Sequence, residues 1–382
     1  MISIRHPRTF HGLIACLFLA AAALRANEPA VSPGNTNAAL QYWQAFSQLP
    51  AMDEHRQQIV ANWNTVPVDA DAVKLIEASS TALTYLHRGS ALESCDWGLQ
   101  KEDGIMLLMP HLAKARELAR LALLRAREEL DTQNSAAAAD DIADVLVLAN
   151  FVGSDTFAIG LLVQDSIEQM AFDLAASRLG QFAPESLRTL ADRLGKLPHG
   201  GTLQSALRNE RQFSLEWMIA RLRNANDQSW QEALRPLAIE TPKGTFEAIV
   251  EELKTKAGAV QEFEEFRPFY DELTTLAERP PDVFRSRAAD LLKKYQNDAV
   301  GRLMLSDFVR VFDKDLATRT RFSLLKAAVA VLLSGPGELR NFPDPAGTGP
   351  FEYAASERGF ELRSKLTIDG RPVVLAVGKP RR

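Results

Sequence analysis

The chain has 382 residues, of which 46% are hydrophobic and 24% charged, and its formal net charge is -5 at pH 7. An acidic surplus argues against nucleic-acid binding, because phosphate recognition needs a basic face. The densest basic cluster, Lys379-Pro380-Arg381-Arg382, is confined to the carboxyl end. The length permits a large hydrophobic core and one to three domains.

Residues 1–26 have the pattern of a signal peptide. Arg5 and Arg8 precede an unbroken apolar run over residues 13–24, and Ala26 offers a small residue at the cleavage point. The run is too short to cross a bilayer core of about 30 Å, which takes about 20 helical residues. We therefore predict an extracytoplasmic protein, periplasmic or secreted, with no stable membrane insertion after signal cleavage. A lipoprotein is not predicted, because polar residues rather than the apolar run precede Cys16.

Signal cleavage would change both the charge and the cysteine content. It removes three arginines and no acidic residue, which leaves 41 basic side chains against 49 acidic ones. Cys16 is lost as well, so Cys95 is the single cysteine of the mature chain and no internal disulfide is predicted. Stability must then come from packing.

Helical periodicity dominates the mature chain. Over residues 110–130 apolar side chains recur every three or four positions with Arg and Glu between them, which is typical of an amphipathic helix. After a polar break at residues 131–134, Ser135 is a candidate cap for a second helix. We expect these two helices to fold back as an antiparallel pair. Further helices are predicted over residues 38–49, 54–63, 70–87, 156–179, 202–224, 246–256, 260–276, 281–295 and 316–333, with a shorter one near Pro184.

The composition changes after Leu333. Residues 334–350 are too dense in Pro and Gly for a helix. Alternating residues then predict short strands at residues 351–353, 359–364 and 373–377, with turns at Glu357-Arg358 and Asp369-Gly370. Because a lone hairpin is marginally stable in water, we expect this tail to pack on the helix that ends at Leu333.

The predicted fold class is mainly α, with stacked antiparallel helical hairpins and a small C-terminal β-hairpin or meander. The hairpins form either a bundle or an irregular α-solenoid that is tetratricopeptide-like in part, over residues 112–152. No 34-residue period recurs, so a regular repeat array is not predicted. The predicted domains are the signal peptide (1–26), a helical domain (27–334) with a sub-boundary near 196–202, and a linker with a β-rich tail (335–382).

The sequence contains none of the local signatures of hydrolases or metalloenzymes. There is no His-Glu-x-x-His, no Gly-x-Ser-x-Gly and no phosphate-binding glycine loop, so we predict no metal, no cofactor and no catalytic residue. Ser323-Leu324-Leu325-Lys326 matches Ser-x-x-Lys, but no Lys-Thr-Gly follows, and we interpret the match as coincidence. His111, at the start of a helix, is interpreted as a capping or surface residue.

Two further groups of residues are candidate sites. Asp140 and Asp144 lie one helical turn apart and could raise one pKa for acid catalysis, but a solvated helix face explains them better. Cys95, Asp96 and Trp97 stand on a predicted loop, and loops on rigid scaffolds often hold functional residues.

We therefore take Cys95, Asp96 and Trp97, with Asp103 and Arg116, as candidate binding residues. A structural alternative stays open for the loop. Trp97 would plug the end of the helical stack, Asp96 would cap backbone amides, and Cys95 would be a small buried hydrophobe.

Several stretches resemble a family of uncharacterised secreted helical proteins from planctomycete and verrucomicrobial bacteria. They are residues 37–46 (NAALQYWQAF), Cys95-Asp96-Trp97-Gly98, Pro110-His111-Leu112 and residues 344–364. The resemblance implies a compartment and an architecture without a reaction. The last stretch also resembles the tail hairpin of type II secretion pseudopilins, although their long apolar N-terminal helix is missing here.

Two functional hypotheses follow. The first is a non-catalytic extracytoplasmic binding or scaffold protein whose stacked helices hold an envelope protein, a peptide or a glycan. The second is a cell-envelope hydrolase whose acid and base come from separate helices, for example Asp96 or Asp103 with Glu210 and Arg116. The absence of local catalytic signatures favours the first.

Overall fold

The computed structural model describes residues 36–154, 157–239, 244–357 and 359–378. In these residues seventeen α-helices precede a three-stranded antiparallel sheet, so the predicted fold class is confirmed. The predicted signal peptide lies outside the described residues. Among the described helices, none has both the length and the apolar character that a membrane span requires.

The first four described helices form a unit that packs on the next two. They are α2 (Ala38–Ser47), α3 (Glu54–Ala61), α4 (Ala70–Ala78) and α5 (Ser80–Ser90). α2 pairs with α5, and all four helices contact α6 (Pro110–Asp131). The single helix predicted over residues 70–87 is wrong, because the chain divides at the buried Ser79. Its hydroxyl donates to the carbonyl of Leu75 (2.7 Å) and competes with the helical hydrogen bonds.

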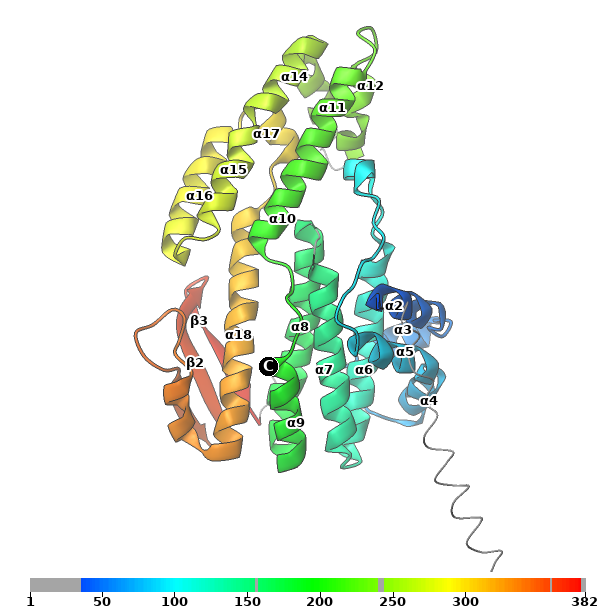
Figure 1. Ribbon diagram of the computed structural model, residues 1–382, viewed down its shortest axis with the longest axis vertical. Coiled ribbons are helices and arrows are strands. Elements are labelled where there is room, and N and C mark those ends of the chain that lie inside the picture. The colour runs from blue at the N-terminus through cyan, green and yellow to red at the C-terminus, as the bar shows by residue number, and fades with distance from the viewer. Residues whose placement is uncertain (1–35, 155–156, 240–243, 358, 379–382) are drawn as a thin grey trace, which may run out of the picture. The chain divides into compact units, whose positions relative to one another are not determined.

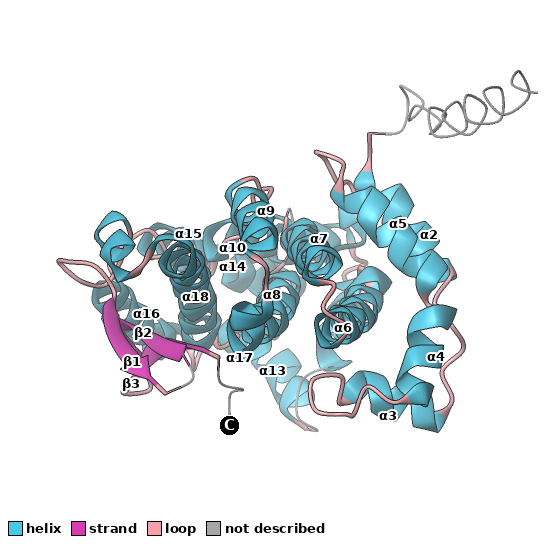
Figure 2. Cartoon of the chain, turned by 90° about the horizontal axis from the view of Figure 1, so that it is seen from below, coloured by secondary structure: helices cyan, strands magenta, loops and turns pink. Residues whose placement is uncertain are grey.

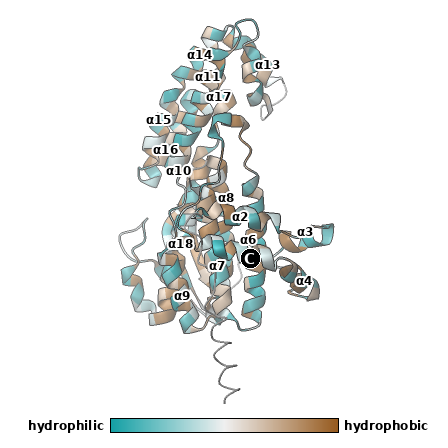
Figure 3. Cartoon of the chain, turned by 45° about the vertical axis from the view of Figure 1, so that its right-hand side comes forward, coloured by the Kyte–Doolittle hydropathy of each residue, from teal (hydrophilic) through white to brown (hydrophobic). Residues whose placement is uncertain are grey.

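A layer of long helices forms the centre of the protein. α6, α7 (Ser135–Gly153) and α8 (Ala158–Arg178) pack in sequence, and α18 (Phe308–Ser334) packs on the far side of α8 (Figure 1). α9 (Pro184–Gly195) packs on both α7 and α18. The predicted pairing of α6 with α7 is confirmed, with Asn134 instead of Ser135 as the N-cap of α7. Apolar residues are concentrated along α8 (Figure 3).

A second set of shorter helices follows α9. The helix predicted over residues 202–224 is divided by the π-helical turn η3 (Arg211–Leu215). The helix predicted over residues 260–276 is divided at Phe266, because Pro268 cannot continue a preceding helix. The set comprises α10 (Leu203–Glu210), α11 (Glu216–Asn224), α12 (Gln231–Leu234), α13 (Thr245–Leu253), α14 (Lys256–Glu265), α15 (Arg267–Leu276), α16 (Pro281–Tyr295) and α17 (Ala299–Met304).

Two hydrophobic clusters share the compact unit formed by residues 37–382. The first contains side chains of α2 to α9, the second half of α18 and the sheet. The second contains side chains of α10 to α17 and the first turns of α18. α8 contributes to both clusters, with Leu161 in the second and Val163 in the first. The two clusters are therefore joined through α8 and α18.

The sheet packs on α18 (Figure 2). Its strands β1 (Glu352–Ser356), β2 (Gly359–Ile368) and β3 (Arg371–Val377) are ordered β1-β2-β3. The predicted turn at Asp369-Gly370 is confirmed, with φ angles of 50° and 73°. Such positive φ angles favour tight antiparallel hairpins.

The Pro/Gly-rich segment before the sheet is held by Asp344. Its buried carboxylate accepts hydrogen bonds from the Ser364 hydroxyl (2.7 Å), the Lys365 amide (2.6 Å) and the Ala346 amide (3.1 Å). A buried carboxylate needs several such donors to offset its lost hydration. Asp344 and Ser364, which belong to the pseudopilin-like stretch, therefore act together as a structural clasp.

Candidate functional site

Trp97 lies in the hydrophobic core. Its indole stacks on the rings of Phe46 (6.1 Å between centroids) and His111 (4.6 Å), and its Nε1–H donates to the carbonyl of Phe151 (2.9 Å). Only 7% of the residue is exposed. These contacts satisfy both the apolar body and the polar tip of the side chain.

Asp96 and Cys95 tie the loop to its surroundings. The Asp96 carboxylate accepts the amide of Gly98 (2.9 Å), and the backbone of Asp96 exchanges two hydrogen bonds with the side chain of Asn37 (both 2.8 Å). Burial, together with the charge of Asp96, raises the pKa of the Cys95 thiol to about 12. A thiol with so high a pKa is a poor nucleophile.

His111 is buried, so its interpretation as a capping or surface residue is wrong. Burial lowers the pKa of its imidazole to about 4, and neither ring nitrogen has a hydrogen-bond partner in the described part of the chain. The ring is neutral and stacks on Trp97. The apolar neighbours of the first cluster explain why the histidine is drawn inward.

The predicted site residues do not meet in one place. Cys95, Asp96 and Trp97 line a cavity of about 270 Å³, whereas Arg116 lines a separate cavity of about 560 Å³ between α3 and α6. Asp103 is exposed on the short helix η1 (Lys101–Met106) and lines neither cavity. Glu210, part of the hydrolase hypothesis, lines a third cavity.

The interpretation of Asp144 as part of a solvated helix face is wrong. Its buried carboxylate receives Arg193 Nη2 (2.7 Å), His87 Nδ1 (2.8 Å) and the Ser90 hydroxyl. Asp140 pairs with the same Arg193 (3.1 Å). Asp144 raises the pKa of His87 through its hydrogen bond. This network joins α5, α7 and α9. Its polar groups bind one another, so they serve the fold and not a ligand.

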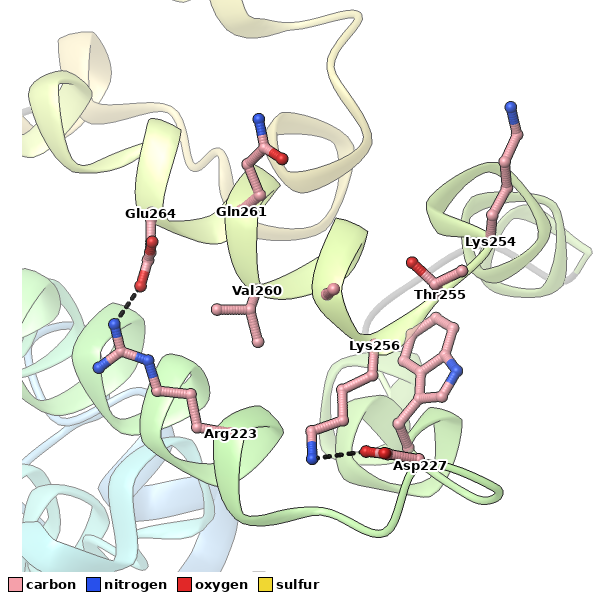
Figure 4. A pocket seen from close by; sticks show the side chains of 10 residues that line it. Arg223, Asp227, Lys254, Thr255, Lys256, Val260, Gln261 and Glu264 are labelled. Atoms are coloured by element: carbon pink, nitrogen blue, oxygen red, sulfur yellow. Dashed lines mark hydrogen bonds and ion pairs between the residues drawn. The ribbon is translucent and has the colours of Figure 1, made fainter.

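A recess of about 630 Å³ lies beside α14 (Figure 4). Its charges are largely paired with one another. Arg223 pairs with Glu264, and Lys256 Nζ lies 2.8 Å from Asp227. Because these pairs neutralise the wall, the recess offers little for a charged ligand.

A larger cavity, of about 790 Å³, lies where the two hydrophobic clusters meet. We call it the junction groove. It is formed by four segments distant in sequence, and most of its lining is apolar. The lining residues are Gly104, Ile105, Leu107, Met109, Phe157, Ala158, Ile159, Leu162, Glu210, Ser214, Ser306, Asp307, Arg310, Val311 and Lys314.

Gly104 positions one wall of the groove. Its φ is +60°, and a Cβ at this position would lie 2.1 Å from Cδ2 of Trp217. Only glycine allows the indole to pack so closely on the backbone. After this anchor Ile105 and Leu107 line the groove, whereas Met106 and Leu108 are exposed.

Three exposed apolar side chains belong to the segments that form the groove: Ile159 lines it, and Met106 and Leu108 alternate along the chain with its lining residues. Leu108 is 81% exposed, and Met106 and Ile159 are each 49% exposed. These are three of the eight large hydrophobic side chains that are exposed in the described residues.

The acidic groups of the groove are engaged by the protein itself. Glu210 accepts the amide of Ala158 (3.2 Å) and the Ser214 hydroxyl (3.1 Å), which joins the start of α8 to the π-helical turn. Asp307 caps α18 by accepting the amide of Arg310 (3.1 Å).

The cations of the groove are not paired with carboxylates of the described residues, although Lys314 donates one hydrogen bond to the carbonyl of Leu162. Arg310 and Lys314 lie about one turn apart on α18, and neither forms a salt bridge among the described residues. Arg116, a predicted site residue, adds positive potential near Lys314. One side of the groove can therefore attract an anion.

Three buried carboxyl groups follow groove-lining residues along α8 and α18. They are Asp165 and Glu168 of α8 and Asp315 of α18, which we call the carboxyl cluster. Arg319 Nη2 pairs with Asp315 (2.7 Å), and Gln164 Nε2 donates to Glu168 (3.2 Å).

Asp165 is the least compensated member of the cluster. It has no exposed surface, and neither of its oxygens accepts a well-formed hydrogen bond in the described residues. The hydroxyl of the neighbouring Thr318 donates to the carbonyl of Lys314 (2.9 Å) instead.

Burial determines the protonation of the carboxyl cluster. It raises the pKa of Asp165 to about 7, with the charge of Asp315 as a further cause. It raises the pKa of Glu168 to about 8, helped by the charge of Asp165. The pKa of Asp315 is also raised by burial, against the opposing effect of Arg319. Asp165 and Glu168 therefore hold protons near neutral pH.

Neither the carboxyl cluster nor the junction groove was predicted from the sequence. Asp165 and Glu168 share one helical face with the buried Leu161 and Phe172, at helical spacing. The presence of carboxyl groups within an apolar helical stripe could therefore have indicated buried acidic residues. The run of apolar residues at 105–109, outside any predicted helix, was a second signal.

Comparisons with models of known protein families, with curated proteins and with solved structures found no match. The resemblance to the planctomycete and verrucomicrobial family stays a prediction.

The groove wall provides the first prediction. Gly104→Ala places a methyl group against Trp217 and strains a positive φ, so we expect a loss of about 1–3 kcal/mol in stability. Amide hydrogen exchange should increase over residues 101–109. Gly195→Ala is the control, because a methyl group there would meet nothing within 4 Å and the φ of Gly195 is not positive. Equal exchange in both variants would contradict the assigned role of Gly104.

The carboxyl cluster provides a second prediction. Because the folded pKa of Asp165 lies above its ordinary value of 3.8, the folded state retains a proton that the unfolded state releases. Wild-type stability should therefore fall as the pH rises from about 4 to about 7, by on the order of 4 kcal/mol from this group. Asp165→Asn should reduce that slope.

The measurement is urea unfolding across the pH range, and the quantity compared is the slope of the unfolding free energy against pH. This slope stays informative if the variant is less stable at every pH. Asp103→Asn, at an exposed position, is the control and should keep the wild-type slope. An unchanged slope in Asp165→Asn would refute the assignment.

Proposed function

We propose that this protein is a non-catalytic extracytoplasmic helical binding protein, and that the junction groove holds an apolar peptide segment carrying an acidic side chain. One observation carries the proposal. The exposed Ile159 lines an apolar groove together with Arg310 and Lys314, and the exposed Met106 and Leu108 alternate along the chain with groove-lining residues.

These exposed apolar side chains support a partner of matching character. Full burial of one large apolar side chain contributes about 1.5–3 kcal/mol. Large parts of the Leu108 and Ile159 side chains are exposed to water in the free protein, so much of this stabilisation is absent without a ligand. A segment that covers them would gain it on binding.

Arg310 and Lys314 support an acidic group on that segment. Glu210 and Asp307 are already engaged by internal donors, so the groove presents Arg310 and Lys314 as its available charges. A peptide can carry a carboxylate next to large apolar side chains. A neutral glycan lacks both features, which is why we favour a peptide over a glycan.

The hydrolase alternative receives less support. Asp96, Glu210 and Arg116 line three different cavities. Both oxygens of Glu210 accept internal hydrogen bonds, an arrangement that suits a structural role at the start of α8. The extracytoplasmic compartment is part of the proposal and depends on the signal-peptide pattern of residues 1–26.

The test is an array of immobilised peptides that vary systematically in apolar and acidic content, followed by fluorescence anisotropy with the peptides that bind. We expect binding by peptides that combine large apolar residues with Asp or Glu. The double variant Leu108→Ser, Ile159→Ser should weaken binding more than about tenfold, from the lost apolar burial. The double variant Arg310→Glu, Lys314→Glu should abolish the preference for acidic peptides.

A matched control makes the same change of charge elsewhere. Arg287→Glu with Lys293→Glu alters two exposed residues of α16 outside the groove and should bind like the wild type. If the control variant lost binding as strongly as the groove variants, a specific site at the groove would be refuted. Binding without any preference for acidic peptides would refute the role of Arg310 and Lys314.

A further inference from the structure

We infer that the carboxyl cluster regulates the junction groove by controlling whether the ammonium group of Lys314 is available to an anionic ligand. With the cluster protonated, Lys314 serves the groove. With Asp165 ionised, Lys314 is drawn to it and its charge is compensated inside the protein. This inference rests on the proposed function, because it concerns the ligand of the same groove.

The position of Lys314 carries the inference. Lys314 lines the groove, and its Nζ donates to the carbonyl of Leu162 (3.2 Å), which also lines the groove. Asp165 follows Leu162 by about one turn of α8, and Asp315 directly follows Lys314 on α18. Lys314 therefore stands between the groove and the cluster, and it interacts electrostatically with Asp165.

Asp165 is the member of the cluster that lacks a partner. It is fully buried, and neither oxygen accepts a well-formed hydrogen bond within the described part of the chain. An ionised carboxylate in that position needs a cation. Arg319 is held by Asp315 at 2.7 Å, so Lys314 is the cation that can respond.

The other charged groups around the cluster determine how ionisation of Asp165 acts on Lys314. On α8, Glu168 faces Asp165, and on α18 the facing groups are Lys314, Asp315 and Arg319. From the first residue of α10, the backbone amide of Leu203 acts on Asp315 without contributing a net charge.

Two more cations act on Lys314. Arg116 of α6 and Arg310 of α18 both oppose its positive charge. Their repulsion pushes Lys314 toward any newly formed carboxylate, and in the present structure the nearest candidate is Asp165.

The sign of the pH dependence follows. As the pH rises through about 7, Asp165 loses its proton and competes with the ligand for Lys314. Affinity for an anion should fall, whereas affinity for a neutral apolar ligand should not. By linkage, an anion bound in the groove should help the cluster to retain its proton.

The experiment compares two dyes that share one apolar frame. Anilinonaphthalene sulfonate carries a sulfonate that stays ionised across the range, and N-phenyl-1-naphthylamine is its neutral counterpart. Dissociation constants of both dyes are measured by fluorescence between about pH 5 and about pH 9 on the full mature chain. For the wild type we expect anion affinity to fall at least about fivefold, with neutral-dye affinity unchanged.

Two variants separate this inference from general effects of pH. Asp165→Asn should keep high anion affinity at every pH, because no carboxylate competes for Lys314. Lys314→Met should bind the anion weakly at every pH and the neutral dye as the wild type does. Circular dichroism checks that both variants remain folded. The change of dye affinity with pH is compared within each variant, so a difference in absolute affinity between variants does not affect the result.

Each outcome is decisive. Leu108→Ser with Ile159→Ser must weaken both dyes, and failure to do so overturns the proposed function together with this inference. Groove-dependent binding with an anion affinity that does not change with pH in the wild type overturns the inference alone. A pH dependence that survives Asp165→Asn also overturns it.

Discussion

The contact between α8 and α18 is the constraint on which the rest of the structure depends. α8 begins at the groove, continues past the carboxyl cluster and ends in the first hydrophobic cluster. α18 follows a matching course, from the second cluster to the helix face that supports the sheet. Because this one helix pair joins both clusters, its polar middle section lies directly next to the groove-lining residues Leu162 and Lys314.

Close backbone approaches hold the chain where it passes between the clusters. A Cβ on Gly201 would lie 2.1 Å from the carbonyl oxygen of Gly153, and one on Gly200 would lie 2.3 Å from Oδ1 of Asn150. Gln164 adds a hydrogen bond, in which its Oε1 accepts the Gly201 amide (2.8 Å). The segment before α10 therefore crosses α7 and α8 at a distance that side chains would not permit.

The sequence predicted the fold well where a single local rule applies. Helical spacing located the long helices α6, α7 and α8, and the Asp369-Gly370 turn followed from its residue types. The divisions at Ser79 and Phe266 were missed, because they depend on a competing hydroxyl and on one proline within otherwise periodic stretches.

The site was harder to predict, because its four segments are far apart in sequence. Of the predicted binding residues, only Arg116 contributes to the electrostatics of the groove. Trp97 drew attention as a large aromatic on a loop, but a tryptophan serves a core equally well. The buried state of Asp144, Asp165 and His111 depends on which helices pack against them, and periodicity alone does not give that pairing.

The central claim is that ligands bind at the junction groove. Methyl NMR of methionine-labelled protein tests it most directly, because Met109 lines the groove and Met106 lies between the lining residues Ile105 and Leu107, whereas Met52 and Met170 lie elsewhere. On titration with anilinonaphthalene sulfonate, the methyl signals of Met106 and Met109 should shift while those of Met52 and Met170 stay in place. Unchanged Met106 and Met109 signals, with shifts at Met52 or Met170, would contradict the account.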